Sequence, residues 1–371
     1  MEISVLRNNF YKALQKVINV IPSKTTIDIL YNLLLKTEDG KLKIIATDLE
    51  ITQISWCDCE IIEDGSIVIP GKLLSDILRE MPDNQLNLKV DSNFKINLKS
   101  PFGEYKLSGQ SVNDFPNVPS LETEDTIKIK NEYLRRMIEK TQFACSTDNL
   151  RPALTGVFCQ IYEDHIRMVS TDGHRLVKIS NVDFSSPNLQ RELVVPTRAL
   201  NLVARNLAEK GEQSIILGKN HVLFEFEDTL IYSRIISEPY PDYERVIPEN
   251  NSKELSINRE SLIASVKRVS LFSNPISYQV KLNINENKIN IFAQDIDFGG
   301  EAHEAIDCKY TSPELDIAYN ANYLLDTLRH VDTEEIRLTL ESSDGPGLVY
   351  PQKQKDKEEL LMLVMPVRLS S

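Results

Sequence analysis

The stretch Ser170-Thr171-Asp172-Gly173-His174-Arg175-Leu176 decides the fold, because versions of it occur three times in the chain. An earlier version is Ala46-Thr47-Asp48-Leu49-Glu50-Ile51, and a more divergent one is Ala293-Gln294-Asp295-Ile296-Asp297-Phe298. Successive aspartates are separated by about one third of the 371 residues. The units of solenoid proteins are much shorter, at roughly 20–50 residues. The long period therefore indicates three copies of a whole domain.

A second shared block follows each aspartate. Residues 67–74 (IVIPGKLL) match residues 193–200 (LVVPTRAL) and, less closely, residues 317–324 (IAYNANYL). The first two copies also end alike, in DFPNVP at 114–119 and DYERVIP at 242–248, whereas the third copy lacks this ending. Such divergence is expected if each copy of an ancient duplication has acquired its own task.

Polar linkers and hydrophobic periodicity define the expected domains. The linkers LETEDT and ENNSK predict domains at 1–122, 127–249 and 250–371. Apolar residues recur at helical spacing in six segments, which are 7–24, 71–81, 131–143, 196–211, 258–271 and 320–332. Most of the remaining chain alternates apolar and polar residues between short turns, as strands do. Each copy is therefore expected to be an α+β domain with two helices on one face of an antiparallel sheet.

The composition excludes several classes of protein. No apolar run approaches the roughly 18 residues of a membrane-spanning helix, and the N-terminus lacks the basic flank and apolar run of a signal peptide. The five cysteines are an odd number without metal-ligand spacing, which indicates reduced thiols. We therefore expect a cytoplasmic protein that binds neither a metal nor a cofactor.

The net charge of −13 would by itself argue against nucleic-acid binding, but the charges are unevenly distributed. The six predicted helices contain 16 of the 42 basic residues and only 8 of the 55 acidic ones. This distribution indicates one basic surface on an otherwise acidic protein. The basic residues on the outward helix faces are Lys12, Lys16, Arg79, Arg135, Arg136, Lys140, Arg198, Arg205, Lys267 and Arg268.

The repeated aspartates allow two interpretations. Asp48, Asp172 and His174 could belong to a metal-dependent hydrolase, which would cleave nucleic acid with magnesium or manganese. Aspartate also favours turns, in which its carboxylate accepts hydrogen bonds from nearby backbone N–H groups. A catalytic site is needed once, and no nucleophile, base or third metal ligand accompanies each aspartate. We therefore expect turn residues, and neither a catalytic nor a metal site.

Several motifs resemble those of one family, the bacterial DNA polymerase III β subunits, or sliding clamps. They are Asn32-Leu33-Leu34-Leu35, Ala46-Thr47-Asp48-Leu49-Glu50, Thr171-Asp172-Gly173-His174-Arg175-Leu176, Pro241-Asp242-Tyr243 and Met365-Pro366-Val367-Arg368-Leu369. The resemblance covers essentially the whole chain. It implies a homodimer, joined head to tail in a ring of six similar clamp domains. The helices would line the hole, and the sheets would lie outside.

The resemblance further implies a non-catalytic processivity factor for DNA replication. The ring would encircle double-stranded DNA without reading its sequence. It would tether the replicative polymerase catalytic subunit, the clamp loader, other polymerases and repair proteins through a hydrophobic pocket for a short peptide. A domain of this length is roughly 35 Å across, so three would leave almost no hole, whereas six would leave a hole about one domain wide. The alternative is a DNA-binding or repair module without a ring.

The resemblance assigns residues to three surfaces. The peptide pocket would have apolar walls, an adaptable methionine and two arginines at its rim. Its residues would be Leu154, Thr171, Gly173, His174, Arg175, Leu176, Pro241, Val246, Leu363, Met365, Pro366, Val367 and Arg368. Lys24 would join the basic helix residues in facing DNA. The dimer interface would include Tyr105, Leu107, Leu271 and Phe272, and an acidic cluster of Asp295, Asp297, Glu301 and Glu304 would face Lys72, Lys99 or Lys106 there.

Overall fold

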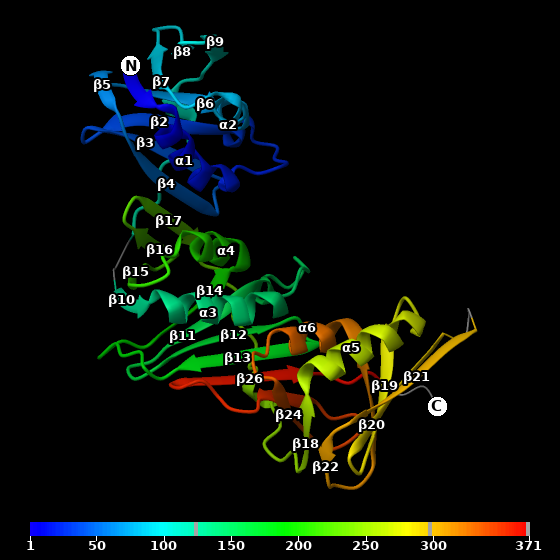
Figure 1. The fold of residues 1–371 in the computed structure, drawn as a ribbon. Coiled ribbons are helices and arrows are strands. Elements are labelled where there is room, and N and C mark those ends of the chain that lie inside the picture. Colours follow the sequence, from blue (N-terminus) through cyan, green and yellow to red (C-terminus); the bar gives the residue numbers. More distant parts are fainter. Residues whose placement is uncertain (122–124, 296–298, 369–371) are drawn as a thin grey trace. The chain divides into compact units, whose positions relative to one another are not determined.

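The computed structural model describes residues 1–121, 125–295 and 299–368, and it consists of antiparallel sheets with helices packed on them (Figure 1). The chain forms two compact units. One contains Met1–Leu134 and Arg198–Ile235, and the other contains Arg135–Thr197 and the residues from 236 onward. The second copy of the repeat thus contributes to both units. The α+β construction of each copy is confirmed, whereas the three domain boundaries stay a prediction.

The six predicted helices are present, and each copy contributes two of them. Their bounds are α1 (Arg7–Val17), α2 (Gly71–Glu80), α3 (Asn131–Thr141), α4 (Thr197–Asn206), α5 (Arg259–Val269) and α6 (Ala321–Arg329). The apolar spacing correctly predicts which face is buried, because α1 buries Phe10, Ala13, Leu14 and Val17. Every charged residue of these six helices except Lys140 is half-buried or exposed.

The first helix is shorter than the predicted segment 7–24. α1 ends at Val17, and a single 3-10 turn, Ile18–Val20, follows it. Ile21 then has a ψ of 121°. The ring of Pro22 explains this extended conformation, because proline disfavours the helical conformation in the residue before it.

The first unit contains two antiparallel sheets. The five-stranded sheet has the order β5 (Glu60–Glu63), β1 (Glu2–Leu6), β7 (Gln85–Val90), β8 (Lys95–Ser100) and β9 (Gly103–Ser108). The eight-stranded sheet has the order β10 (Asp125–Lys130), β15 (Glu212–Leu217), β16 (His221–Phe226), β17 (Thr229–Arg234), β4 (Ile51–Asp58), β3 (Lys41–Thr47), β2 (Asn32–Glu38) and β6 (Ser66–Pro70). The larger sheet combines strands of the first and second copies.

The second unit is built in the same way. Its nine-stranded sheet has the order β14 (Arg191–Pro196), β11 (Gly156–Ile161), β12 (Ile166–Thr171), β13 (Arg175–Asn181), β26 (Glu358–Val364), β25 (Gly347–Pro351), β24 (Glu335–Leu340), β18 (Lys253–Asn258) and β22 (Lys309–Tyr310). Its four-stranded sheet has the order β21 (Gly300–Asp307), β20 (Lys288–Asp295), β19 (Gln279–Asn285) and β23 (Leu315–Asn320). Here the larger sheet combines strands of the second and third copies.

Two strand pairs join successive copies. β4 of the first copy pairs with β17 of the second, and β13 of the second copy pairs with β26 of the third. In both pairs, the strand that follows an aspartate turn is joined to the last strand of the next copy. The corresponding strands without a partner of this kind are β21 of the third copy and β9 of the first. Each ends its sheet in the part of the chain that the structure describes.

Candidate functional site

The aspartate turn of the second copy is fixed by its own side chains. Oδ1 of Asp172 accepts hydrogen bonds from the N–H groups of His174 at 2.9 Å and Arg175 at 3.0 Å. Oγ1 of Thr171 accepts the N–H of Gly173 at 3.0 Å. Gly173 has a φ of 90°, a conformation that glycine adopts without strain. These hydrogen bonds therefore fix the backbone of the turn locally.

The first copy repeats this arrangement. Oδ1 of Asp48 accepts the N–H groups of Glu50 at 3.0 Å and Ile51 at 2.7 Å. Leu49 has a φ of 77°, although it is not a glycine. The prediction that these aspartates are turn residues is thus confirmed for both copies. In the third copy, Asp295 lies next to residues 296–298, which are outside the described residues.

Arg175 holds the second turn to the third copy. Its guanidinium donates to Asp172 at 3.1 Å and to Asp326 of α6 at 2.9 Å, and it also donates to the carbonyl oxygen of Phe143 at 2.8 Å. The same group lies over the rings of Phe143 and Tyr323, 5.2 and 5.1 Å from their centroids. The side chain of Arg175 is therefore buried, and each of its three guanidinium nitrogens donates a hydrogen bond. Its place at the rim of a peptide pocket stays a prediction.

His174 connects the turn to the C-terminal segment. Its ring stacks on Tyr323 with centroids 5.1 Å apart, and its carbonyl oxygen accepts the N–H of Met365 at 2.8 Å. The N–H of Val367 donates to the carbonyl oxygen of Ala318 at 2.8 Å. These backbone bonds hold the residues that follow β26 close to the turn. His174 of the second copy and Met365 of the third, both predicted pocket residues, therefore meet here.

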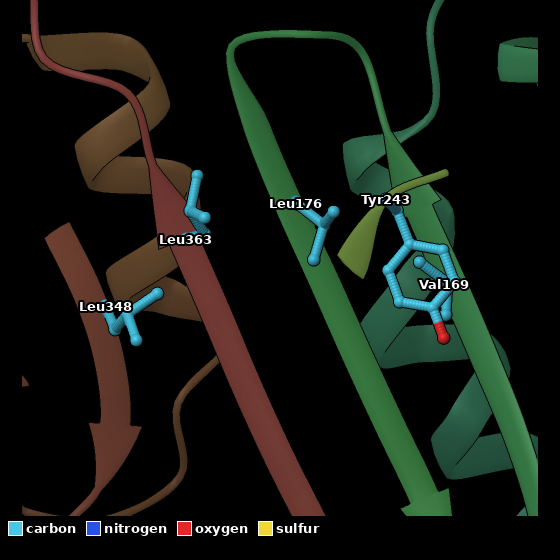
Figure 2. Packing of buried hydrophobic residues seen from close by; sticks show 5 residues of the cluster. All are labelled: Val169, Leu176, Tyr243, Leu348 and Leu363. Carbon is cyan, nitrogen blue, oxygen red and sulfur yellow. The ribbon is translucent and has the colours of Figure 1, made fainter. Parts of the chain in front are cut away.

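An apolar cluster lies beside this turn on the face of the β13–β26 pair. Figure 2 shows its buried members, which are Val169, Leu176, Tyr243, Leu348 and Leu363. Leu176 and Leu363 stand directly opposite each other in the register. Partly buried side chains pack around the cluster and extend it toward the surface; these are Phe158, Tyr240, Ile247, Tyr350, Leu361 and Met365. We call the buried and partly buried residues together the apolar site.

Polar groups fix the aromatic wall of the apolar site. Tyr243 donates its hydroxyl to Oε1 of Gln160 at 2.7 Å and accepts from Arg167 at 3.1 Å. Burial raises the pKa of Tyr243 to about 12, and burial likewise raises the pKa of Tyr240. The ring of Tyr240 stacks on Phe158 with centroids 4.7 Å apart. Both tyrosines therefore stay neutral at physiological pH and present apolar ring faces.

The thirteen predicted pocket residues all lie in the second unit, with different exposures. Leu154, Arg175, Leu176 and Leu363 are buried. Thr171, Met365, Pro366 and Val367 are half-buried, and Gly173, His174, Pro241, Val246 and Arg368 are exposed. Their role in peptide binding stays a prediction. The sequence reasoning missed Phe158, Tyr240 and Leu348, because only Pro241-Asp242-Tyr243 marks this wall in the sequence.

The predicted DNA-facing cations divide into two groups. Lys12, Lys24, Arg79, Arg198, Arg205, Lys267 and Arg268 are exposed. Lys16, Arg135 and Arg136 are half-buried, and Lys140 is buried. Several of them form ion pairs: Lys16 with Asp228, Arg79 with Asp76, Arg198 with Asp48, and Arg268 with Glu304. These pairs reduce the positive charge that the helices present to a ligand.

Lys140 and Arg136 differ most from the expectation for DNA-facing residues. Lys140 donates to Asp332 at 2.6 Å, and burial lowers the pKa of Lys140 despite this carboxylate. Arg136 donates to both carboxylate oxygens of Glu358, from Nε to Oε2 and from Nη2 to Oε1 at 2.7 Å. Its Nη1 also donates to Oδ2 of Asp332 at 2.5 Å. These contacts join α3 to the third copy. The two cations therefore hold the second and third copies together, and their contact with DNA stays a prediction.

The predicted dimer residues are mostly exposed. Leu271 is 81% exposed, Phe272 44% and Tyr105 36%, whereas Leu107 is buried at 6%. A side chain at Gly300 would approach the Phe272 ring to 3.3 Å, so Phe272 lies against the first residue of β21. Asp297 of the predicted acidic cluster lies outside the described residues. An exposed apolar pair at the end of α5 is the kind of feature that marks an interaction surface.

Residues 1–121, 125–295 and 299–368 contain no group of three or more histidine, cysteine, aspartate or glutamate side chains placed to hold a metal ion. They also contain no helix with the length and apolarity needed to cross a membrane.

Comparisons with known proteins cover the entire chain. The models of the DNA polymerase III beta subunit match in all three parts, with the N-terminal domain at residues 1–119, the central domain at 128–242 and the C-terminal domain at 244–368. The beta sliding clamps of Pseudomonas aeruginosa and Vibrio cholerae are 31% and 30% identical to the chain, with all of each chain covered.

Solved structures give the same result. The DNA polymerase III subunit beta from Pseudomonas aeruginosa superposes with a TM-score of 0.94 at 30% identity, and the DNA polymerase sliding clamp from Bacillus subtilis with 0.93 at 25%. Both matches cover all of each chain. The chain therefore belongs to the DNA polymerase III beta subunit family.

Proposed function

We propose that this chain is a DNA sliding clamp, which acts in the cytoplasm as a non-catalytic processivity factor for the replicative polymerase. Two subunits would close into a ring around duplex DNA and tether their partners to it. The observation that carries this proposal is how successive copies are joined: the strand after an aspartate turn pairs with the last strand of the next copy. By this pattern, β21 and β9 are the two strands in the described residues that still lack a partner of this kind. If β21 of each chain pairs with β9 of the other, the two chains form a closed, twofold-symmetric assembly.

The strand register of the proposed β21–β9 junction can be inferred from the two junctions within the chain, β4–β17 and β13–β26. Across β4 and β17, Thr52 faces Tyr232, and across β13 and β26, Leu176 faces Leu363. Leu176 also pairs with Thr171 on the preceding strand, as Glu301 pairs with Gln294 in the third copy. Glu301 is therefore the equivalent of Thr52 and Leu176 in β21.

The hairpin of β8 and β9 identifies the residue opposite Glu301. Thr229 is the first residue of β17 and faces Phe226, as Gly103 is the first residue of β9 and faces Ser100. Tyr232 lies three residues after Thr229, so its equivalent is Lys106. Lys106 of one subunit would then stand opposite Glu301 of the other. An opposite-charge pair at this position favours the proposed register.

The same register supports the predicted apolar contact. Leu107 would face Gly300, and Phe272 lies against Gly300. Tyr105 would face Ala302, which is on the side of β21 that also carries Glu304, the partner of Arg268 in α5. The apolar residues would thus gather on the helix side of the junction, next to Leu271. The charged residues would lie on the opposite face.

The proposed β9–β21 junction between subunits differs from the two internal junctions on the face of the sheet that points away from the helices. The β4–β17 pair is covered by an apolar cluster that contains Ile45, Ile54 and Phe115, and the β13–β26 pair is covered by the apolar site with Tyr243. Phe115 and Tyr243 belong to the DFPNVP and DYERVIP endings, which the third copy lacks. The subunit junction would therefore bury less apolar surface, and it would open more readily than the internal junctions.

The apolar site is proposed to receive a short hydrophobic peptide from polymerases, the clamp loader and repair proteins. Half-buried Met365 offers apolar surface at its margin, and the exposed Val246 is bonded through its N–H to Tyr243 of the site. Methionine adapts its shape to different ligands, which suits a site with several partners. The hydrogen-bonded turn at Asp172 would preorganise the neighbouring backbone, which lowers the entropic cost of binding.

The DNA contact is proposed to be diffuse. The exposed helix cations, among them Lys12, Arg205 and Lys267, would approach phosphates without a fixed register. Internal ion pairs such as Arg198 with Asp48 weaken the attraction. A weak contact suits a ring that must slide, because strong phosphate binding would hold it in place.

The register predicts the effect of reversing one charge. A Lys106→Glu substitution should place two carboxylates together at both junctions of the ring and weaken the dimer by about tenfold or more, because like charges directly opposite repel. Sedimentation at decreasing protein concentration would measure this change. Adding Glu301→Lys should restore most of the lost affinity, and Lys128→Glu, an exposed strand lysine elsewhere, should have no effect. Failure of the rescue would show that the register is wrong.

A further inference from the structure

The register proposed for β9 of one subunit and β21 of the other also places a carboxylate opposite a histidine. If Lys106 faces Glu301, then Glu104 of β9 faces His303 of β21, because the strands run antiparallel. Both side chains are exposed in the subunit, and both lie on the same face as Lys106 and Glu301. We propose that protonation of His303 tightens the ring by pairing the imidazolium with Glu104 of the second subunit. This inference rests on the proposed ring.

The surroundings of His303 favour such a response. On its own strand, Glu301 and Asp307 share its face, since side chains alternate along a strand. On the preceding strand its direct neighbour is Phe292, and beyond it Lys281 is paired with Asp316 at 2.7 Å. The intervening residue Glu304 faces α5. The charge nearest to His303 from the second subunit would be the carboxylate of Glu104.

Glu104 is already oriented within its own subunit. Asn97 donates to its Oε1, and Nζ of Lys99 lies 3.9 Å from the same oxygen. Among the described residues, Oε2 has no such contact, and it remains available to a donor on the adjoining strand. The other charged neighbour on β9 is Lys106, which would face Glu301. A neutral imidazole opposite Glu104 makes no ion pair, whereas a protonated one makes a charge-assisted hydrogen bond.

The direction of the effect follows from the charges. A protonated imidazole can pair with a carboxylate and a neutral one cannot, and histidine is the side chain that changes charge around physiological pH, so the comparison is made at about pH 5.5 and about pH 8. The ring should therefore be tighter at the lower pH and should lose this contribution as the pH rises. Glu304 does not obscure the effect, because the hydrogen bond from Arg268 lowers the pKa of Glu304 and keeps it ionised throughout. Two such pairs close one ring, so a change of about three- to tenfold in the dimer dissociation constant is expected.

The test compares dissociation constants at about pH 5.5 and pH 8 for four proteins, by sedimentation of the full chain at nanomolar concentrations. The natural chain should dissociate more readily at pH 8. His303→Gln and Glu104→Gln should each lose this pH dependence. His165→Gln is the matched control, because His165 also lies beside a carboxylate, that of Asp164, but outside the proposed junction; it should behave like the natural chain.

Exchanging the two residues makes the test direct. The double variant with Glu104→His and His303→Glu places the same groups opposite each other in reverse, so it should regain the pH dependence that the single variants lose. The proposal is overturned if the natural chain dimerises equally at both pH values, or if His303→Gln keeps the full dependence. A chain with the subunit mass at every concentration would instead refute the ring itself. The two failures are thereby distinguished.

Discussion

Removal of residues 366–371 is expected to abolish stimulation of the replicative polymerase while leaving the dimer intact. The segment follows Met365 at the edge of the apolar site, and Val367 is held to Ala318 by a backbone hydrogen bond. Without it, the proposed peptide site loses one wall, whereas β9 and β21 are unchanged. Primer extension with and without the clamp would measure stimulation, and sedimentation would measure the dimer. Undiminished stimulation would show that partners dock elsewhere.

A single substitution separates loss of the site from loss of local structure. Val246 is 49% exposed, and its N–H donates to the carbonyl oxygen of Tyr243 in the apolar site, so Val246→Asp adds a charge next to the site without disturbing the core. A desolvated charge against an apolar peptide should weaken partner binding by about tenfold or more. Val182→Asp is the matched control, because Val182 is 50% exposed but lies outside the site. Equal effects of the two substitutions would contradict the assignment.

The second large effect is expected at the end of α5. Replacing Leu271 and Phe272 together by aspartate should convert the dimer to single subunits of 42.3 kDa, because four buried charges per ring would replace its apolar contacts. Light scattering at micromolar concentration would show the mass. Leu150→Asp is a suitable control, since Leu150 is 90% exposed in another loop. A persistent dimer in the double variant would place the interface elsewhere.

The sequence predicted the helices well because their faces are set by local periodicity. The stripe of Phe10, Ala13, Leu14 and Val17 can be read directly from spacing, and the structure buries all four residues. The aspartate turns were equally accessible, because the hydrogen bonds of Asp48 and Asp172 connect residues within one turn. The helix end at Val17 was missed, although Pro22 marks it, because the apolar pattern continues through Ile18 and Ile21.

The partners of individual charges could not be predicted from the sequence. Lys140 and Arg136 stand on a polar helix face, yet their carboxylates, Asp332 and Glu358, come from a different copy. Arg175 is drawn inward by Asp326 in the same way. Helical periodicity shows that a residue faces away from its own core, but only the fold shows whether solvent or another copy lies there.

The joining of copies through shared sheets was likewise beyond the sequence. A local pattern of apolar residues can indicate a strand, but it does not specify the strand's long-range partners. Only the register of the two observed junctions reveals which strands, β21 and β9, are left to be joined. The resemblance to the clamp family had nevertheless marked Leu271 and Phe272, and Phe272 lies against Gly300 at the start of β21, the strand that is left to be joined.

Retention on DNA of different topology tests the central claim most directly. The clamp would be loaded onto nicked circular plasmid, and the bound fraction would be measured by gel filtration at a salt concentration that abolishes ordinary electrostatic binding. A closed ring should stay on the circle and be lost within minutes after a restriction enzyme linearises it, because it slides off the ends. Equal retention on both forms, or equal loss from both, would contradict the account.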